Sequence, residues 1–540
     1  MKVCEKILRY LAQNGVKEVF GVPSATFSPI VDAMNDFKDI EYVRVRNEQA
    51  AGFSAAKASK VTGKLSICLL SGSVGIANAV NGIAEARQSK SPVLVIGGYV
   101  NRWQQGLGAI QELEGVKLLS GITKHSVIVK DSQDIIKELK KAMEIAMEHP
   151  RGPVHVGIPL DLQKELYTGE EYGLIDIKTV ASDYTALDKA VNLINQCEKG
   201  LIIVGGGCRG LGDKIKKLEE KLNWPIVSTT SGKAVLEEDY RLHMGNFGFP
   251  GTDLANKVVL EDKSIECILA LGTQLGENST QNFNKELVKG RKLIHIDIDK
   301  NTFNKAYNED VPVAADLSDA LEYLETNILK KYICNDIDEP LNDDYAGEEL
   351  KFSMRRFFEN ITKILPKNTF YMNDIGSSQN YCYKFLNVPK EGDFECNICY
   401  GCMASTTGAI GIARANPDRP IAVVIGDGSF QMNYASELAT MKQYNLKIIT
   451  FVVKNGTLEF VRKGHEVLFE RTMDIFYDPP IDILKIAGAY GIPSIKVEAD
   501  EDLDKLRFID LDGPIVVELN HDINEPMPLG RLSLLKKSIK

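Results

Sequence analysis

The stretch IAVVIGDGSF, residues 421–430, joins five apolar residues to Gly426, Asp427, Gly428 and Ser429. A short apolar run bounded by turn residues is typical of a fully buried strand in a parallel sheet. The two glycines let a ligand approach the backbone without side-chain obstruction. Open α/β sheets bind ligands beyond the carboxyl ends of their strands. The stretch therefore predicts both a parallel sheet and a ligand site at Asp427.

A second apolar run, IITFVV at residues 448–453, is followed closely by Asn455 and Thr457. Because the carboxyl ends of parallel strands meet at one edge of a sheet, we expect Asp427 and Asn455 to be neighbours. A carboxylate and a carboxamide, joined by a backbone carbonyl, are hard oxygen ligands of the kind that Mg²⁺ requires when it holds a diphosphate. An isolated Gly-Asp-Gly is equally compatible with a simple tight turn.

Short apolar runs alternate with helical patterns along three blocks of the chain, at residues 1–165, 183–330 and 350–530. That alternation is typical of parallel sheets covered by helices. Two polar stretches, KELYTGEEYGLIDIKTVASDY and CNDIDEPLNDDYAGEEL, separate the blocks and are interpreted as linkers. A length of 540 residues also exceeds what one hydrophobic core supports. We therefore expect an α/β protein of three doubly wound αβα domains with mainly parallel sheets.

The composition excludes several classes of partner. A net charge of −10 argues against nucleic acid and anionic membranes, which favour clustered Lys and Arg. The longest apolar runs are too short to cross a bilayer. The first residues, MKVCEKILRYLAQNGVKEVFGVP, are charged and amphipathic, which predicts a surface helix and a cytoplasmic location instead of a cleaved signal peptide. Ten scattered cysteines indicate reduced thiols and no disulfide framework.

The segment GDGSFQMNYASELATMKQYNLKIITFVVKNGTLEFVR, residues 426–462, resembles the diphosphate-binding motif of thiamine diphosphate enzymes. Its closest likeness is to the acetolactate synthases, with one extra residue before Glu437. The resemblance implies that Asp427, Asn455 and the carbonyl oxygen of Thr457 coordinate Mg²⁺. Upstream, NDIGSSQNY resembles the family's Asp-x-Gly turn. The residues that the resemblance places at the diphosphate are Gly376, Ser377, Ser378, Gly426, Asp427, Gly428, Ser429 and Asn455.

The first block carries the complementary half of the same resemblance. RVRNEQAAGFSAAKASKVTGK, residues 44–64, is similar to the motif in which a glutamate hydrogen-bonds N1′ of the aminopyrimidine, with Glu48 in the glutamate position. Taken alone, Glu48 is also a normal residue for the first turn of a helix. Asn78 looks like the corresponding residue of the pyruvate decarboxylases, and we expect it to contact the cofactor. The family implies pyrimidine-binding, central and diphosphate-binding domains with six-stranded sheets, and a homodimer or homotetramer with sites at subunit interfaces.

The resemblance also implies a chemistry. In these enzymes a carboxyl group at N1′ favours the imino tautomer of the pyrimidine, whose 4′ nitrogen removes the proton from C2 of the thiazolium. The carbon nucleophile attacks a 2-oxo acid, and the ring accepts the electrons left when CO₂ departs. We therefore expect an enzyme that decarboxylates or cleaves a 2-oxo acid and transfers the acyl-anion equivalent to an acceptor carbonyl. A non-ligating decarboxylase, or a carbon–carbon lyase or hydrolase of the same family, is the alternative.

Other residues bear on the substrate. IQELE, residues 110–114, resembles the Phe-Gln-Glu of acetolactate synthases and pyruvate oxidases, which implies that Gln111 faces the substrate. The paired histidines of simple decarboxylases have no counterpart, because the first histidine is His125, and this favours a carboligase. His465 is either a polar group over the site or a solvated loop residue. Leu160 replaces the lysine of acetolactate synthases, so the resemblance does not fix pyruvate as donor or acceptor.

The second block contains LIIVGGGCRGLG, residues 201–212, a glycine-rich turn between a predicted strand and helix. In acetolactate synthases and pyruvate oxidases the corresponding domain binds FAD, whereas in other members it binds ADP, another nucleotide or nothing. No acidic residue about 20 positions later completes a dinucleotide fingerprint. FAD is therefore one of several alternatives for this domain.

Three cysteines in ECNICYGCMAS, residues 395–405, have a spacing used by iron–sulfur and zinc proteins. Cys396, Cys399 and Cys402 would need a fourth ligand, and the nearest other cysteine is Cys382. An iron–sulfur or zinc protein is the remote alternative to the thiamine interpretation. The resemblance instead places Cys402, or Met403 if the register shifts by one, beneath the thiazolium ring.

Overall fold

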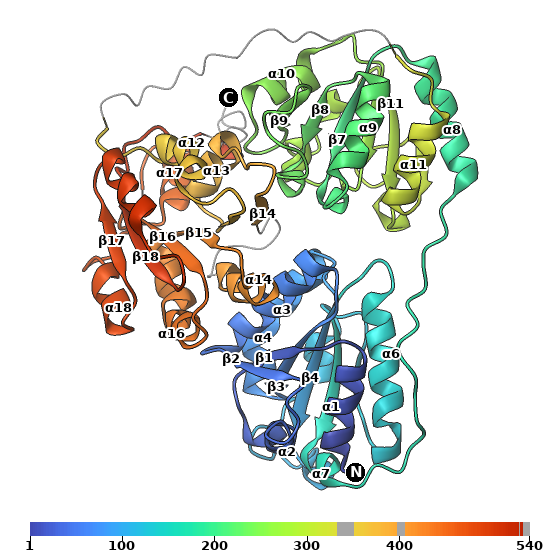
Figure 1. The fold of residues 1–540 in the computed structure, drawn as a ribbon, viewed down its shortest axis with the longest axis vertical. Coiled ribbons are helices and arrows are strands. Elements are labelled where there is room, and N and C mark those ends of the chain that lie inside the picture. The colour runs from blue at the N-terminus through green and yellow to red at the C-terminus, as the bar shows by residue number, and fades with distance from the viewer. Residues whose placement is uncertain (332–349, 397–404, 473, 529, 533–540) are drawn as a thin grey trace.

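Three six-stranded sheets organise the chain in the computed structural model, which describes residues 1–331, 350–396, 405–472, 474–528 and 530–532 (Figure 1). Every strand pair with an assigned register in the described chain is parallel. Helices cover both faces of each sheet. The predicted class, three doubly wound α/β domains, is confirmed.

The first sheet has the strand order β2-β1-β3-β4-β6-β5. Its strands are β1 (Glu18–Gly21), β2 (Glu41–Arg44), β3 (Ser66–Ser71), β4 (Val93–Tyr99), β5 (Ser126–Ile128) and β6 (Val154–Pro159). Its helices are α1 (Val3–Gln13), α2 (Ser28–Ala33), α3 (Glu48–Thr62), α4 (Val74–Gln88), α5 (Gly115–Leu119), α6 (Ile135–Met147) and α7 (Leu160–Lys164).

The α3 helix begins at Glu48 because the side chain of Asn47 accepts a hydrogen bond from Gln49 N at 2.9 Å, an N-cap. It ends where Gly63 adopts a left-handed conformation, with φ of 67°.

The second sheet has the order β12-β11-β10-β7-β8-β9. Its strands are β7 (Gly200–Val204), β8 (Ile226–Ser228), β9 (His243–Asn246), β10 (Cys267–Leu271), β11 (Lys292–Asp297) and β12 (Val311–Ala314). Its helices are α8 (Tyr184–Gln196), α9 (Gly212–Leu222), α10 (Asp253–Glu261) and α11 (Leu317–Asn327). The order reverses direction at β7, which lies between β8 and β10. Such a reversal opens a crevice at the carboxyl ends of the strands.

The third sheet has the order β14-β13-β15-β16-β18-β17. Its strands are β13 (Phe370–Asn373), β14 (Asp393–Cys396), β15 (Ile421–Gly426), β16 (Ile448–Lys454), β17 (Ser494–Val497) and β18 (Ile515–Asn520). Its helices are α12 (Met354–Ile364), α13 (Ser377–Phe385), α14 (Ala409–Ala415), α15 (Asp427–Ser429), α16 (Ala435–Gln443), α17 (Glu459–Phe469) and α18 (Ile483–Ala489). The register pairs Gly426 with Val453, so Asp427 and Asn455 follow the same edge of the sheet.

The first and third domains pack directly on each other. Helix α3 lies against α14 (Figure 1), and Ser54 Oγ donates to Thr407 O at 3.4 Å. Gly411 is required there because a Cβ at this position would overlap the carbonyl of Ser54. Alanines of α3, such as Ala51, share one buried apolar cluster with Ile410. Small side chains therefore let these two helices approach closely.

Five edge strands, β5, β9, β12, β14 and β17, were not among the apolar runs that predicted the sheets. The first linker carries no helix or strand from residue 165 to 183, apart from an isolated bridge between Lys2 and Leu166. Most of the second linker lies outside the described residues. In the described part of the chain, no helix combines the length and apolar character needed to cross a membrane.

Candidate active site

The carboxylate of Asp427 lies at the carboxyl edge of the third sheet, as the first residue of α15. Its Oδ2 accepts hydrogen bonds from Gly456 N at 2.7 Å and Asn455 N at 3.2 Å. The residue is only 2% exposed, and burial raises the pKa of the carboxyl group, while the amides of Gly456 and Asn455 oppose that rise. The structure thus brings together the two loops that the sequence placed at one sheet edge.

Asn455 has a defined orientation within its turn. Its Nδ2 donates to Glu459 Oε2 at 3.0 Å, while its Oδ1 accepts from Thr457 N at 3.2 Å. A carboxylate only accepts hydrogen bonds, so Glu459 fixes which end of the carboxamide carries the nitrogen. The carboxamide oxygen is then on the side of Thr457.

The donor set around Asp427 fits Mg²⁺. Asp427 supplies a carboxylate and Asn455 a carboxamide oxygen, both hard oxygen ligands, and the carbonyl oxygen of Thr457 stays a predicted third ligand. Among the described residues there is no cluster of three or more His, Cys, Asp or Glu side chains arranged for a metal. A site with a single carboxylate suits a cation that takes its remaining ligands from phosphate and water.

A buried polar floor lies beside this edge, at the end of β13. Asp374 is 1% exposed and accepts from Ser405 Oγ at 2.9 Å through Oδ1. Burial raises the pKa of Asp374 to about 6, with the hydroxyls of Ser429 and Ser405 opposing the rise. Within the described chain, Asn373 Oδ1 and Thr406 Oγ1 have no hydrogen-bond partner. Buried polar atoms normally have partners, so the floor has spare hydrogen-bonding capacity for a polar ligand.

The expected diphosphate residues of NDIGSSQNY lie at the same edge. Gly376 precedes α13, and Ser377 is the first residue of this nine-residue helix. Backbone N–H groups at a helix N-terminus favour phosphate. Ser378 Oγ lies 3.4 Å from Asn373 Nδ2, and Ser377 is hydrogen-bonded to Glu459. The structure therefore gathers Gly376, Ser377 and Ser378 near Asp427, while their contact with diphosphate stays a prediction.

Glu48 and Asn78 form the other half of the expected site. Asn78 Nδ2 donates to Glu48 Oε2 at 2.9 Å, which ties α4 to the start of α3. Gly75 packs beside this pair, since a Cβ there would lie 2.7 Å from Ser71 Oγ and 3.4 Å from Glu48 Oε1. Asn78 is exposed, and Val74 beside it is 53% exposed. In the described chain, the face around Glu48 is open.

Glu437 of α16 is a residue that the sequence did not single out for this role. Its Oε1 accepts from the backbone N–H groups of Arg46 and Asn47, both at 2.9 Å, and Thr440 Oγ1 donates to Oε2 at 2.6 Å. Burial raises the pKa of Glu437 to about 7, although these donors oppose the rise. The third domain thus holds the loop that presents Glu48. The only sign of this role in the sequence is that Glu437 is a lone acidic residue within the apolar pattern of α16.

Gln111, His465 and Cys396 are the other predicted site residues in the described chain. Gln111 is exposed on a loop and has a φ of 64°. His465 is half-buried on α17, edge-on to Phe469 at 5.4 Å between ring centroids. Cys396 is buried and hydrogen-bonded to Tyr383. The other two cysteines of the proposed metal motif, Cys399 and Cys402, and the alternative Met403 lie outside the described residues.

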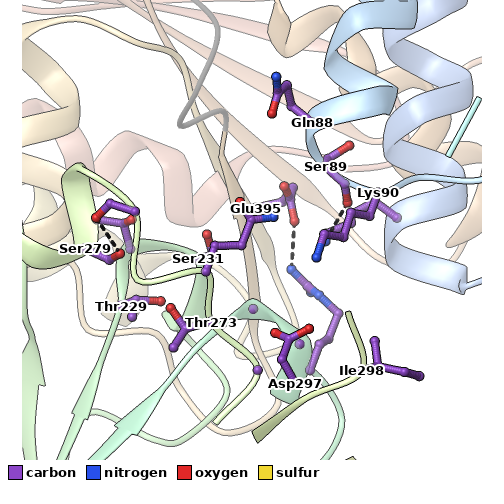
Figure 2. A pocket seen from close by; sticks show the side chains of 18 of the residues that line it. Gln88, Ser89, Lys90, Thr229, Ser231, Thr273, Ser279, Asp297, Ile298 and Glu395 are labelled. Atoms are coloured by element: carbon purple, nitrogen blue, oxygen red, sulfur yellow. Dashed lines mark hydrogen bonds and ion pairs between the residues drawn. The ribbon is translucent and has the colours of Figure 1, made fainter. Parts of the chain in front are cut away.

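A large cavity of about 810 Å³ lies where the three domains meet (Figure 2). Loops at the carboxyl ends of β7, β8, β10 and β11 line one side, including Thr229, Ser231, Thr273 and Asp297. Glu395 of the third domain lies on another side. The cavity therefore occupies the switch point of the central sheet, where α/β domains bind ligands.

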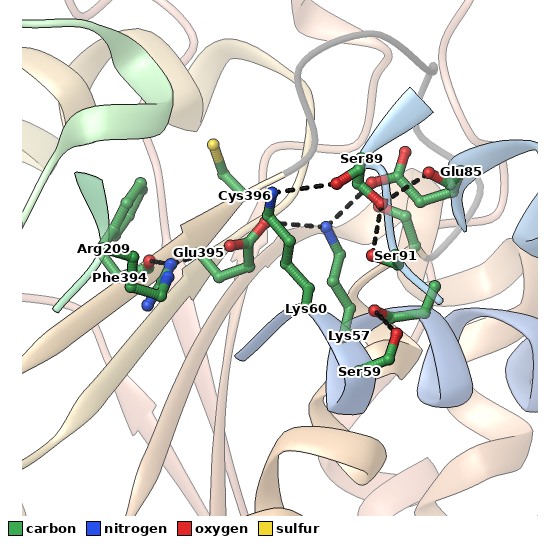
Figure 3. Close-up of polar contacts among 12 residues, drawn as sticks. Lys57, Ser59, Lys60, Glu85, Ser89, Ser91, Arg209, Phe394, Glu395 and Cys396 are labelled. Carbon is green, nitrogen blue, oxygen red and sulfur yellow. Dashed lines mark hydrogen bonds and ion pairs between the residues drawn. The ribbon is translucent and has the colours of Figure 1, made fainter. Parts of the chain in front are cut away.

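A buried ionic junction joins the three domains beside this cavity (Figure 3). Lys57 of α3 is fully buried, and its Nζ lies 3.0 Å from Glu85 Oε1 and 3.1 Å from Glu395 Oε1. Glu395 Oε2 also accepts from Arg209 Nη2 of the central domain at 2.9 Å. Burial lowers the pKa of Lys57, but the two carboxylates outweigh it and raise the pKa above its ordinary value. Lys57 is therefore charged, and its charge is compensated within the junction.

Family models match all three domains of the chain. The thiamine pyrophosphate enzyme N-terminal TPP binding domain matches residues 1–118. The central domain of the same enzymes matches residues 187–324, and their C-terminal TPP binding domain matches residues 374–519. Together these matches include the Glu48 and Asp427 halves of the site and most of the cavity lining.

Several curated proteins are similar over almost the whole chain. A probable acetolactate synthase large subunit of Methanocaldococcus jannaschii is 29% identical, with 100% of this chain and 96% of the relative covered. The acetolactate synthase isozyme 3 large subunit of Escherichia coli is 27% identical, with 93% and 90% covered. The acetolactate synthase large subunit of Lactococcus lactis is 28% identical, with 95% and 91% covered.

Proposed function

The chain belongs to the family of thiamine pyrophosphate enzymes, and on this premise we propose that it decarboxylates or cleaves a 2-oxo acid and transfers the acyl-anion equivalent to an acceptor carbonyl. Similarity to acetolactate synthase large subunits along nearly the whole chain supports this carboligase activity. The observation that carries the proposal is the position of Asp427, whose carboxylate is held by the amides of Asn455 and Gly456.

Mg²⁺ is the proposed cation of this site. Asp427, Asn455 and the carbonyl oxygen of Thr457 would hold it, because their oxygens match its ligand preference. Ser377, Ser378 and Ser429, together with the backbone at Gly376, Gly426 and Gly428, would bind the diphosphate. The spare hydrogen-bonding capacity of Asn373 and Thr406 supports a polar ligand here.

Glu48 is the proposed acid–base residue. Thiamine diphosphate, when bound, supplies a nucleophilic carbon and an electron sink. Glu48 would hold a proton at N1′ of the aminopyrimidine, and Asn78 would orient its carboxylate through the 2.9 Å hydrogen bond. Glu437 would keep the loop before Glu48 in place. Gln111 and His465 are proposed to face the substrate.

We propose that two copies of the chain complete each site, in a homodimer or homotetramer. The open face around Glu48, where Val74 and Asn78 are exposed, supports a second subunit at this position. The family resemblance points the same way, since its pyrimidine and diphosphate halves come from different subunits.

A nucleotide is the proposed occupant of the central cavity. Its place at the switch point of the second sheet supports this, and FAD is one candidate beside ADP or another nucleotide. The absorbance spectrum of the purified protein separates the candidates, because only a flavin colours the protein yellow. Brown colour and bound iron would instead support the iron–sulfur alternative.

A substrate panel tests the proposed activity. The holoenzyme is incubated with a set of 2-oxo acids, with and without carbonyl acceptors, while CO₂ release and product mass are followed. Ligated products that depend on both thiamine diphosphate and an acceptor support the carboligase. Aldehyde alone would indicate the non-ligating decarboxylase. Absence of any thiamine-dependent reaction with 2-oxo acids would contradict the proposal.

A further inference from the structure

A buried histidine and two glutamates lie behind the Asp427 edge, on the side of α17. His521 Nε2 is 3.3 Å from Glu459 Oε1, and His521 Nδ1 is 3.3 Å from Glu525 Oε2. All three side chains are at most 1% exposed. Tyr381 packs edge-on against the imidazole, at 6.2 Å between ring centroids. The histidine is thus enclosed between two carboxylates and an aromatic ring.

Glu525 anchors this group to the body of the third domain. It accepts hydrogen bonds from Ser353 Oγ at 2.8 Å and from the backbone N–H of Met354 at 3.0 Å, at the N-terminus of α12. Donors at a helix N-terminus stabilise a carboxylate. Glu525 therefore fixes the position of His521 from one side, and Glu459 is the partner of His521 on the other side.

Glu459 is the residue through which the group reaches the cofactor edge. One carboxylate oxygen faces His521, and the other accepts from Asn455 Nδ2 at 3.0 Å. Ser377 is hydrogen-bonded to the same carboxylate. A single buried side chain therefore contacts a candidate cation ligand and a candidate phosphate ligand.

The charges agree with this arrangement. Burial alone would lower the pKa of His521, but Glu459 and Glu525 raise it to about 9. Glu459 is buried as well, yet the pKa of its carboxyl group is lowered, chiefly by the hydrogen bond and charge of His521. The geometry gives the same orientation, because Glu459 Oε2 accepts from Asn455 Nδ2, which places the carboxamide oxygen of Asn455 on the opposite side, toward Thr457.

We propose that Glu459, held in place by His521, is a positioning residue that aims the carboxamide oxygen of Asn455 at the cation and fixes Ser377 beside the diphosphate. This inference rests on the proposed function of the Asp427 edge. Partners behind a metal ligand orient it, and their loss typically weakens metal binding by about 10- to 100-fold. Glu459 lies behind Asn455 in this way, because its carboxylate accepts the hydrogen bond from Asn455 Nδ2.

Binding of Mn²⁺ in place of Mg²⁺ gives a test that does not depend on activity. The chain, freed of cofactor, is titrated with Mn²⁺ in the presence of thiamine diphosphate, and free Mn²⁺ is measured by electron paramagnetic resonance. For Glu459→Ala we expect a weakening of Mn²⁺ binding by about 10- to 100-fold. Glu459→Gln keeps an acceptor oxygen but loses the charge that holds His521, so we expect a smaller weakening of about 3-fold. Glu470→Gln, just beyond the same helix, is the matched control with unchanged binding.

Thermal unfolding of the cofactor-free variants separates positioning from a merely structural role. A structural role would lower the midpoint of unfolding without changing Mn²⁺ affinity in the folded fraction. Equal Mn²⁺ affinity in wild type and in every Glu459 variant that folds would overturn the proposal. Should Glu459→Ala not fold, Glu459→Gln decides the question in the same titration. If wild type itself binds no Mn²⁺ with thiamine diphosphate, the proposed function fails, and this is seen before any variant is compared.

Discussion

Asn78 Nδ2 lies 2.9 Å from Glu48 Oε2, and this hydrogen bond joins the second turn of α4 to the first residue of α3. The contact orients Oε2 of Glu48, while Oε1 lies next to the buried Gly75. Because Asn78 is exposed and Glu48 is half-buried, the pair lies at the surface of the described chain.

Replacing Glu48 tests the acid–base role directly. For Glu48→Gln we expect the rate of product formation to fall by about 10²- to 10⁴-fold, the range for loss of a general acid or base. Asn78→Ala removes only the orienting hydrogen bond, so we expect a loss of about 10-fold. Initial rates at saturating thiamine diphosphate measure both effects, with cofactor binding determined by calorimetry. Full activity of Glu48→Gln would contradict the mechanism.

Mixing two inactive variants tests where each site is completed. If Glu48 of one subunit works with Asp427 of another, a mixed dimer of Glu48→Gln and Asp427→Ala contains one intact site. Random reassociation of equal amounts should then restore about a quarter of the wild-type activity, because half of the dimers are mixed and each has one of two sites. Sites built within one chain would give no recovery. Subunit exchange is checked with two affinity tags.

The buried carboxyl group of Glu437 predicts a pH-dependent stability. Its folded pKa of about 7 lies above its ordinary value of 4.5, so the folded protein binds more protons than the unfolded chain between these pH values. Stability therefore falls as the pH rises through this window. Glu437→Gln can keep the acceptor oxygen for Arg46 and Asn47 but has no proton to lose. We expect the variant to gain stability relative to wild type from pH 4.5 to 8, by about 3 kcal/mol.

Thermal unfolding across this pH range measures the Glu437 effect, with Glu470→Gln as the exposed control. A constant difference in midpoint between Glu437→Gln and wild type at every pH would contradict a shifted pKa at this residue. The control should follow wild type throughout.

The sequence alone predicted the strands of the sheets wherever a buried strand is a continuous apolar run. β15 and β16 are of this kind, and the residues that follow them, Asp427 and Asn455, were predicted to be neighbours. The missed strands β5, β9, β12, β14 and β17 lie at sheet edges and span at most four residues. Polar residues, glycine or proline interrupt most of them, so no apolar run marked them.

The supporting charges could not be predicted, because their partners lie far away in the sequence. Glu437 binds backbone groups that are about 390 residues distant. Glu459 meets His521 across 62 residues, and Lys57 meets Glu395 across 338. A charged residue in a helix is usually solvated, and only the tertiary packing shows that these ones are buried and paired.

Lys57 gives the last prediction, on the junction of the three domains. Lys57→Met leaves Glu85 buried without its cation, while Glu395 keeps Arg209, and breaking a buried pair in this way typically costs about 3–5 kcal/mol. We therefore expect a lower unfolding temperature than for Lys60→Met, one turn further along α3, whose amine donates to the carbonyl of Ser89 at 3.0 Å. Adding Glu85→Gln to Lys57→Met should recover part of the loss, because one uncompensated charge is removed. Calorimetry of the four proteins measures these shifts, and equal unfolding temperatures for Lys57→Met and Lys60→Met would show that the junction does not stabilise the fold.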